Sequence, residues 1–188
     1  TEGYWNTALG KEALLLNTTG YSNSSVGAFS LFYNSEGSKN TAIGEGALWG
    51  NTTGDLNTAA GQDALFGNAA GLRNSAFGAR SLRDNEGDNA GTPGLAEGSD
   101  NTALGFEALT SNTTGLENTA VGAGALYANT TGIYNTAVGA GALDASTAAS
   151  SNTAVGTGAL AGALGSNNTA LGKDAGSALG TGSHNIMI

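Results

Sequence analysis

The stretch from Asn118 to Tyr134 reads N-T-A-V-G-A-G-A-L-Y-A-N-T-T-G-I-Y, and the same pattern restarts at Asn135. Close copies of it fill the rest of the 188-residue chain. The first Asn of each copy stands at Asn6, Asn23, Asn40, Asn57, Asn74, Asn101, Asn118, Asn135, Asn152, Asn168 and Asn185. Since a short, fixed period is typical of repeat architectures, we interpret residues 1–188 as a single repeat domain of ten coils and a fragment.

Two spacings differ from the usual 17 residues. Asn74 and Asn101 are 27 apart, so ten residues are inserted, and we place them at about 87–96, around the only proline, Pro93. The 16-residue spacing that ends at Asn168 reflects a deletion within 161–167. The N-T-A motif that follows each change is intact, which predicts that both lie in surface turns and that the strands keep their register.

A period of 17 is too short for a helical hairpin repeat. The segment N-T-A-V-G is partly β-branched and ends at Gly, which predicts a strand followed by a glycine corner. A-L-Y-A is predicted to be a second short strand, and N-T-T-G a turn. The fold class expected is therefore all-β, a parallel β-solenoid or β-roll of ten 17-residue coils.

Stacked coils place equivalent residues about 4.7 to 4.8 Å apart, so like side chains form ladders. One ladder is variable in size but always apolar, and we expect it to be enclosed: Leu9, Val26, Ile43, Ala60, Phe77, Leu104, Val121, Val138, Val155 and Leu171. A second, expected in the core as well, is Leu14, Leu31, Leu48, Leu65, Leu82, Leu109, Leu126, Leu143 and Leu160.

The repeated Asn residues predict hydrogen-bonded ladders of amides that run from coil to coil. The N-T-T strings at Asn17, Asn51, Asn112 and Asn129 also match glycosylation sequons. A ladder and turn role explains them without that modification.

Strand alternation leads to an expectation about assembly. In N-T-A-V-G the Thr and Val point one way and the Ala and Gly the other, and neither face carries a charge. A strand uncharged on both faces is normally covered on both. We therefore expect Thr and Val to face the interior of the coil, the Ala and Gly face to contact other copies, and a homotrimer to be favoured over a monomer.

Composition and charge exclude several classes of function. The net charge of −9, with only six Lys and Arg, disfavours nucleic acid and anionic membranes as partners. No apolar run approaches the roughly 20 residues that span a bilayer, and no signal-peptide pattern opens the sequence. With no cysteine there is neither a disulfide framework nor a thiolate metal site, which leaves the compartment undecided.

The search for chemistry leads to no enzyme. The only histidine, His184, is expected in a surface turn, and no Ser-His-Asp set can be assembled around it. No cofactor is expected. A weak Ca²⁺ candidate is the acidic group Asp84, Glu86, Asp88, Glu97 and Asp100 around the insertion, although its spacing does not match an EF-hand and a solvated loop is the favoured interpretation. That loop is also the best candidate for specific recognition.

The recurring N-[TS]-A-[VLIF]-G followed by A-L resembles the head repeats of YadA-like trimeric autotransporter adhesins. It is more similar still to the N-T-A-x-G-x-x-A-L-x-x-N-T-T-G arrays of bacterial and phage tail-fibre-like proteins, and G-S-H-N-I-M-I at 182–188 resembles their closing segment. The resemblance implies a parallel β-roll, a trimeric extracellular fibre on a cell surface or virion-like particle, and attachment to a surface or glycan receptor.

Two other functions stay open. The chain begins within a coil turn, at T-E-G-Y-W, and ends within a strand, so we expect part of a longer fibre, or a filament or matrix subunit that stacks end to end. Ice binding is the weaker alternative, because its threonine rank shares a strand face with the apolar ladder expected inside: Thr7, Thr41, Thr58, Thr102, Thr119, Thr136, Thr153 and Thr169. Aromatic residues in the turns are expected to pack rather than to stack on sugars.

Overall fold

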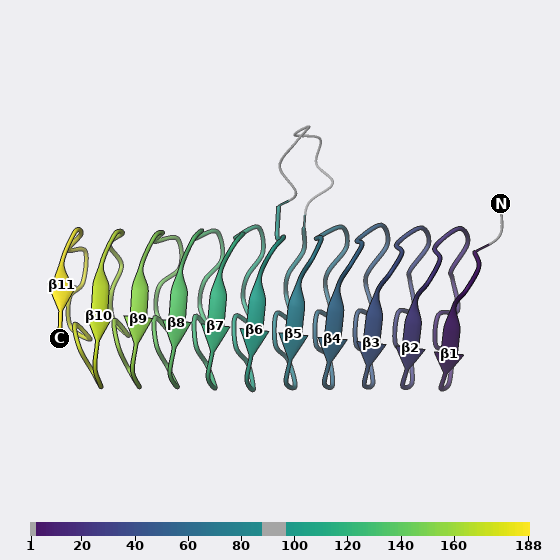
Figure 1. Cartoon of the computed structure of the whole chain (residues 1–188), viewed down its shortest axis with the longest axis horizontal. Coiled ribbons are helices and arrows are strands. Elements are labelled where there is room, and N and C mark those ends of the chain that lie inside the picture. The colour runs from purple at the N-terminus through teal and green to yellow at the C-terminus, as the bar shows by residue number, and fades with distance from the viewer. Residues whose placement is uncertain (1–2, 88–96) are drawn as a thin grey trace.

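The computed structural model describes residues 3–87 and 97–188, and within them it contains strands and turns but no helix. The strands are β1 (Thr7–Leu9), β2 (Ser24–Val26), β3 (Thr41–Ile43), β4 (Thr58–Ala60), β5 (Ser75–Phe77), β6 (Thr102–Leu104), β7 (Thr119–Val121), β8 (Thr136–Val138), β9 (Thr153–Val155), β10 (Thr169–Leu171) and β11 (Ile186–Met187). They form one 11-stranded sheet in chain order (Figure 1). The expected parallel β-solenoid is confirmed.

Each strand pairs in parallel with the equivalent strand of the next coil. Thr119 pairs with Thr136, for example, and Val121 with Val138. Across the insertion Ser75 still pairs with Thr102, and across the deletion Thr153 pairs with Thr169. The strands thus keep their register across both changes in length, as predicted; most of the insertion, predicted at about 87–96, lies outside the described residues.

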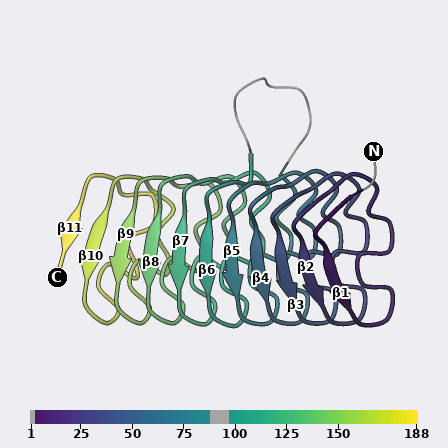
Figure 2. The same cartoon turned by 45° about the vertical axis from the view of Figure 1, so that its right-hand side comes forward.

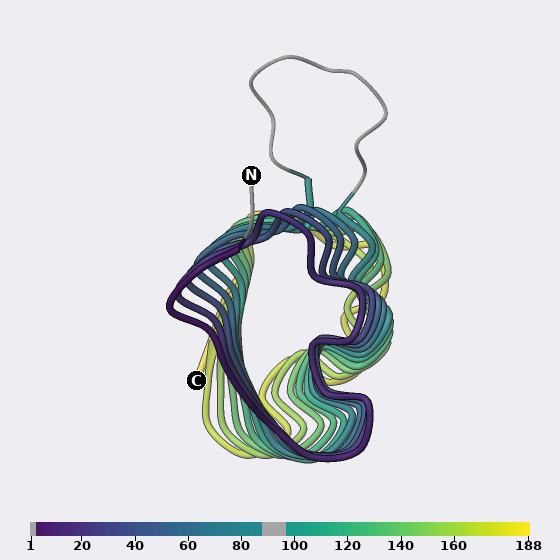
Figure 3. The same cartoon turned by 90° about the vertical axis from the view of Figure 1, so that its right-hand side faces the viewer.

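The coils stack along a single axis into a rod, with the sheet forming one long side of it (Figures 1 and 2). Viewed along the axis, successive coils follow nearly the same closed path (Figure 3). One three-residue strand and a long turning segment therefore make up each coil.

The interior is a narrow column of leucine and alanine. The leucine ladder is fully buried from Leu31 to Leu160, and Leu14 packs against it from the first coil. Two buried ladders, mostly of alanine, complete the interior: one lies at the strand centres, as at Ala137, and one directly before the leucines, as at Ala142, with serine at Ser25, Ser30 and Ser81. The leucine prediction is confirmed, and the small alanines show how little room remains beside that column.

The apolar ladder of the strands is on the outside, so the prediction that it is enclosed is wrong. Val138 is 37% exposed, Leu104 49% and Leu171 54%, whereas the alanine between the two outward residues of each strand from β3 to β9 is completely buried. At the one strand centre with a serine, Ser25 donates a hydrogen bond inward to the Ser30 carbonyl at 2.9 Å. Alanine fits inside because the leucine column already fills the coil.

The predicted second strand at A-L-Y-A does not form. Each leucine of this segment takes left-handed backbone angles, with φ of 52° at Leu126 and 54° at Leu143. Two further positions in each coil have left-handed backbone angles. One is the residue two before the leucine, as at Glu107 (φ 54°), and the other is the residue before the ladder Asn, as at Tyr134 (φ 60°). Left-handed residues bend the chain sharply, which is how so short a coil closes.

The glycine after each strand is a corner, as predicted. Gly122 has a φ of 131°, and a Cβ placed on it would lie 2.6 Å from the carbonyl carbon of Gly139 in the next coil. Neither the angle nor the space admits a side chain.

Candidate functional site

The outward side of the sheet is the most extensive regular surface of the rod. We call it the Thr/aliphatic face and define it by the first and third residues of β1 to β10. The first residues form a hydroxyl rank: Thr7, Ser24, Thr41, Thr58, Ser75, Thr102, Thr119, Thr136, Thr153 and Thr169. The third residues form an apolar rank: Leu9, Val26, Ile43, Ala60, Phe77, Leu104, Val121, Val138, Val155 and Leu171.

No residue of this face carries a charge, and its apolar rank is open to solvent along much of the rod. Leu9, Ile43, Phe77, Leu104 and Leu171 are all more than 40% exposed. Contiguous exposed apolar surface of this kind marks interaction sites on soluble proteins.

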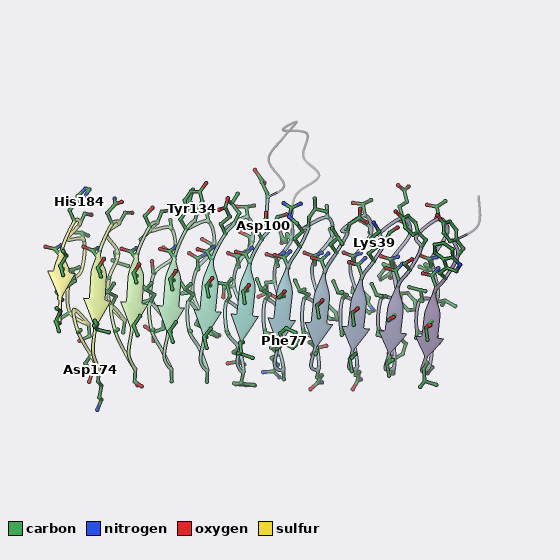
Figure 4. The ribbon with its side chains drawn as sticks, viewed as in Figure 1. Lys39, Phe77, Asp100, Tyr134, Asp174 and His184 are labelled. Atoms are coloured by element: carbon green, nitrogen blue, oxygen red, sulfur yellow. The ribbon has the colours of Figure 1, made fainter. Side chains whose placement is uncertain are left out.

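Charged residues lie along both edges of the face. At one end of the strands lie the residues directly before the ladder asparagines, among them Lys39, Asp100, Tyr134 and His184 (Figure 4). Asp174 lies beyond the opposite end of the strands. The face is therefore an uncharged stripe whose margins mix charged residues with exposed apolar ones such as Leu56 and Phe106.

The strongest ion pair on the margins joins neighbouring coils. Arg73 Nε and Nη2 each donate to the Asp100 carboxylate at 2.6 Å. This hydrogen-bonded carboxylate raises the pKa of the Arg73 guanidinium above its ordinary value. A second pair, Arg80 to Glu107 at 3.0 Å, joins the coils of the same two strands, β5 and β6, on the opposite margin. The three arginines of the chain all fall within 73–83, a clustering that could have pointed to these pairs.

Buried asparagines form two ladders that hold the coils in register. In the first, the backbone N–H of each ladder Asn donates to the side-chain oxygen of its predecessor, as from Asn135 to Asn118 Oδ1 at 3.0 Å. The ladder includes Asn6, Asn40 and Asn57. It also crosses the insertion, from Asn101 to Asn74 at 3.0 Å. The coil-to-coil hydrogen bonds predicted from the sequence are present.

The second ladder comes from the N-T-T turns and their variants. The amide of Asn51 donates to Asn34 Oδ1 at 2.7 Å and to the Gly54 carbonyl at 3.0 Å. Asn51, Asn112 and Asn129 are fully buried. The side chains of these sequon asparagines therefore form hydrogen bonds inside the folded rod.

This second ladder breaks near the C-terminal end. Ser146 and then Ala163 stand where asparagines would follow Asn129, and neither Asn129 Oδ1 nor Ser146 Oγ has a hydrogen-bond partner among residues 3–87 and 97–188. A Cβ on Gly132 would lie 2.3 Å from Asn129 Oδ1, and the coil that lacks the asparagine has Ala149 in place of that glycine. The sequence repeat shows the substitution, but only the structure shows the unpaired atoms.

The aromatic side chains of the early turns pack on one another. Trp49 and Phe66 are stacked, with ring centroids 4.7 Å apart and an angle of 5° between the rings, and Tyr33 meets Trp49 edge-on at 4.5 Å. Tyr4 stacks on Tyr21 at 5.1 Å. Stacking along the rod covers ring faces that a sugar would use, in line with the expected packing role for these residues, whereas Trp5, Tyr127 and Tyr134 remain more than 40% exposed.

The acidic residues proposed for Ca²⁺ do not gather in the part of the chain that the structure describes. Asp88 lies outside the described residues. Asp100 is held by Arg73, and Asp84 lies 3.3 Å from Arg83 Nη1. Glu86 and Glu97 join no group of three potential ligands within residues 3–87 and 97–188.

His184 is exposed in a turn. Among the described residues there is no helix long and apolar enough to cross a membrane. Comparisons with protein-family models, with curated proteins and with solved structures give no match.

Proposed function

We propose that this chain is a structural segment of an extracellular fibre, the shaft or head of a tail-fibre-like or adhesin-like protein that mediates surface attachment. The observation that carries the proposal is the unbroken first asparagine ladder, which keeps every coil in register from Asn6 to Asn185. Ten coils at about 4.8 Å each make a rod roughly 50 Å long. Such a rod suits a spacer or a display surface, and the resemblance of its repeat to fibre arrays supports the same role.

The side chains available for chemistry agree with a non-catalytic role. The chain has one histidine and no cysteine, and the described carboxylates next to arginines are held in ion pairs on the surface. Identical coils offer repeated surfaces rather than a single cleft. We expect binding and support instead of turnover.

Light scattering combined with small-angle X-ray scattering tests the fibre proposal. We expect discrete, elongated particles, with a trimer as the oligomer that the resemblance implies. Filaments visible by electron microscopy would instead favour the rival proposal, a matrix subunit that stacks end to end.

Attachment needs a separate measurement. Beads coated with the folded chain are expected to be retained on cells or on a glycan array, and beads coated with heat-unfolded chain serve as the control. Equal retention of both would contradict an adhesive role and leave a purely structural one.

Ice binding is a second candidate, because the threonine rank points outward instead of sharing an enclosed face. The hydroxyl rank repeats along the rod at about 4.8 Å, a regular spacing that could order water. The varied bulk of the neighbouring apolar rank, from Ala60 to Phe77, argues against the flatness that an ice surface requires. A thermal-hysteresis assay without effect would dispose of this candidate.

A further inference from the structure

The geometry points to the Thr/aliphatic face as the surface through which copies of this chain pack together, parallel and level with one another. This inference rests on the proposed fibre function. It also replaces the earlier expectation that the alanine positions of the strands make the contact, since those alanines are buried within each coil.

Electrostatics favours this surface over the rest of the rod. Each copy carries a net charge of −9, so copies repel one another, and the repulsion is smallest where they meet through a surface without charges. The Thr/aliphatic face has no charged member, and its hydroxyls can find partners across a contact without the cost of burying an ion.

The margins give the surface the anatomy of an interface. Specific interfaces combine an uncharged, apolar centre with a polar rim. Here the hydroxyl and apolar ranks together form the uncharged centre, while Lys39, the Arg73–Asp100 pair and Asp174 lie at the edges (Figure 4). The rim charges stay hydrated when the centre is covered.

The bulk of the apolar rank is compatible with a level, parallel arrangement. Ala60 is the smallest member and lies one coil from Phe77, which is the largest. When copies lie level and in parallel, Phe77 of one copy faces Phe77 of the next, and the recess at Ala60 lies about 4.8 Å away, one coil height, so each ring has space to turn into. Alternation of large and small residues across facing positions is how interdigitated contacts fill space.

The size of the face predicts the strength of association. Ten strands at about 4.8 Å, each three residues or roughly 10 Å wide, give about 500 Å² of flat surface per copy. A standard stable interface buries about 800 Å² per partner. Association is therefore expected to depend on concentration.

Light scattering over a concentration series tests the surface directly. The wild type is expected to exceed its 18.3 kDa chain mass. A Leu104→Lys/Val138→Lys variant, which places two charges on the face, should weaken association about a hundredfold or more. The matched control is Tyr127→Lys/Leu164→Lys, which adds the same two charges at exposed apolar residues off the sheet and, because it lowers the net negative charge, should associate at least as strongly as the wild type.

Because the chain has no cysteine, a single Val138→Cys substitution offers a second test that does not require disruption of the contact. Copies that pack level and in parallel bring their 138 positions together, so oxidation should yield a disulfide-linked dimer. A Tyr127→Cys variant should yield little.

Three results would overturn the inference: a monomeric wild type, equal association of the face and control variants, or equal cross-linking at 138 and 127. If the assembly persists in the Leu104→Lys/Val138→Lys variant, the proposed fibre function is unaffected, but the contact between copies must lie on another surface. A monomeric wild type that produces thermal hysteresis would assign the face to ice instead.

Discussion

Ser146 shows how much one residue of a ladder contributes. It leaves its own hydroxyl and Asn129 Oδ1 buried without partners, and each such atom costs about 1 to 3 kcal/mol. We predict that Ser146→Asn combined with Ala149→Gly extends the ladder and raises the free energy of unfolding by about 1 to 2 kcal/mol. Thermal unfolding should show this as a higher midpoint temperature. Ser146→Asn alone should gain less, because the Ala149 Cβ would crowd the new amide as a Cβ on Gly132 would crowd Asn129. A double variant no more stable than the wild type would contradict the ladder's role.

The strand is the element whose orientation decides the surface of the rod. Ala137 is fully buried at the centre of β8, whereas Ala140 is exposed just beyond the strand. Because the leucine column leaves no spare volume, we predict that Ala137→Leu destabilises the fold by about 1 to 3 kcal/mol or more. Ala140→Leu, the matched control, should change stability little. Chemical denaturation of both variants measures this, and an Ala137→Leu variant as stable as its control would restore the alternative in which the alanines face outward.

The whole rod combines a net charge of −9 with one uncharged side, so salt should act on its assembly by screening repulsion. We predict that association strengthens as salt is raised towards roughly 1 M, where the Debye length is about 3 Å. The Tyr127→Lys/Leu164→Lys variant, with two positive charges added to the −9, should show a weaker salt dependence. Sedimentation equilibrium over a salt series provides the measurement. Dissociation of the assembly by salt would show that ion pairs, rather than the Thr/aliphatic face, hold the copies together.

The repeat in the sequence was sufficient to predict the coil length, the register, the glycine corners, the leucine column and the asparagine hydrogen bonds. Each of these features depends on equivalent residues that stack from coil to coil. The constant spacing of the repeat in the sequence is enough to predict that stacking. The register across the insertion before Asn101 and the deletion before Asn168 was predicted correctly for the same reason, since the N-T-A motif resumes after both.

The tertiary structure alone decided which side of the strand is the interior and how the coil closes. Alternation in T-A-V defines two faces, but it does not say which one meets the leucine column; the volume left beside Leu126 admits Ala120 and turns Val121 outward. The segment expected to be a second strand instead bends through left-handed residues such as Leu126, because a circuit of 17 residues must turn back on itself within so short a path.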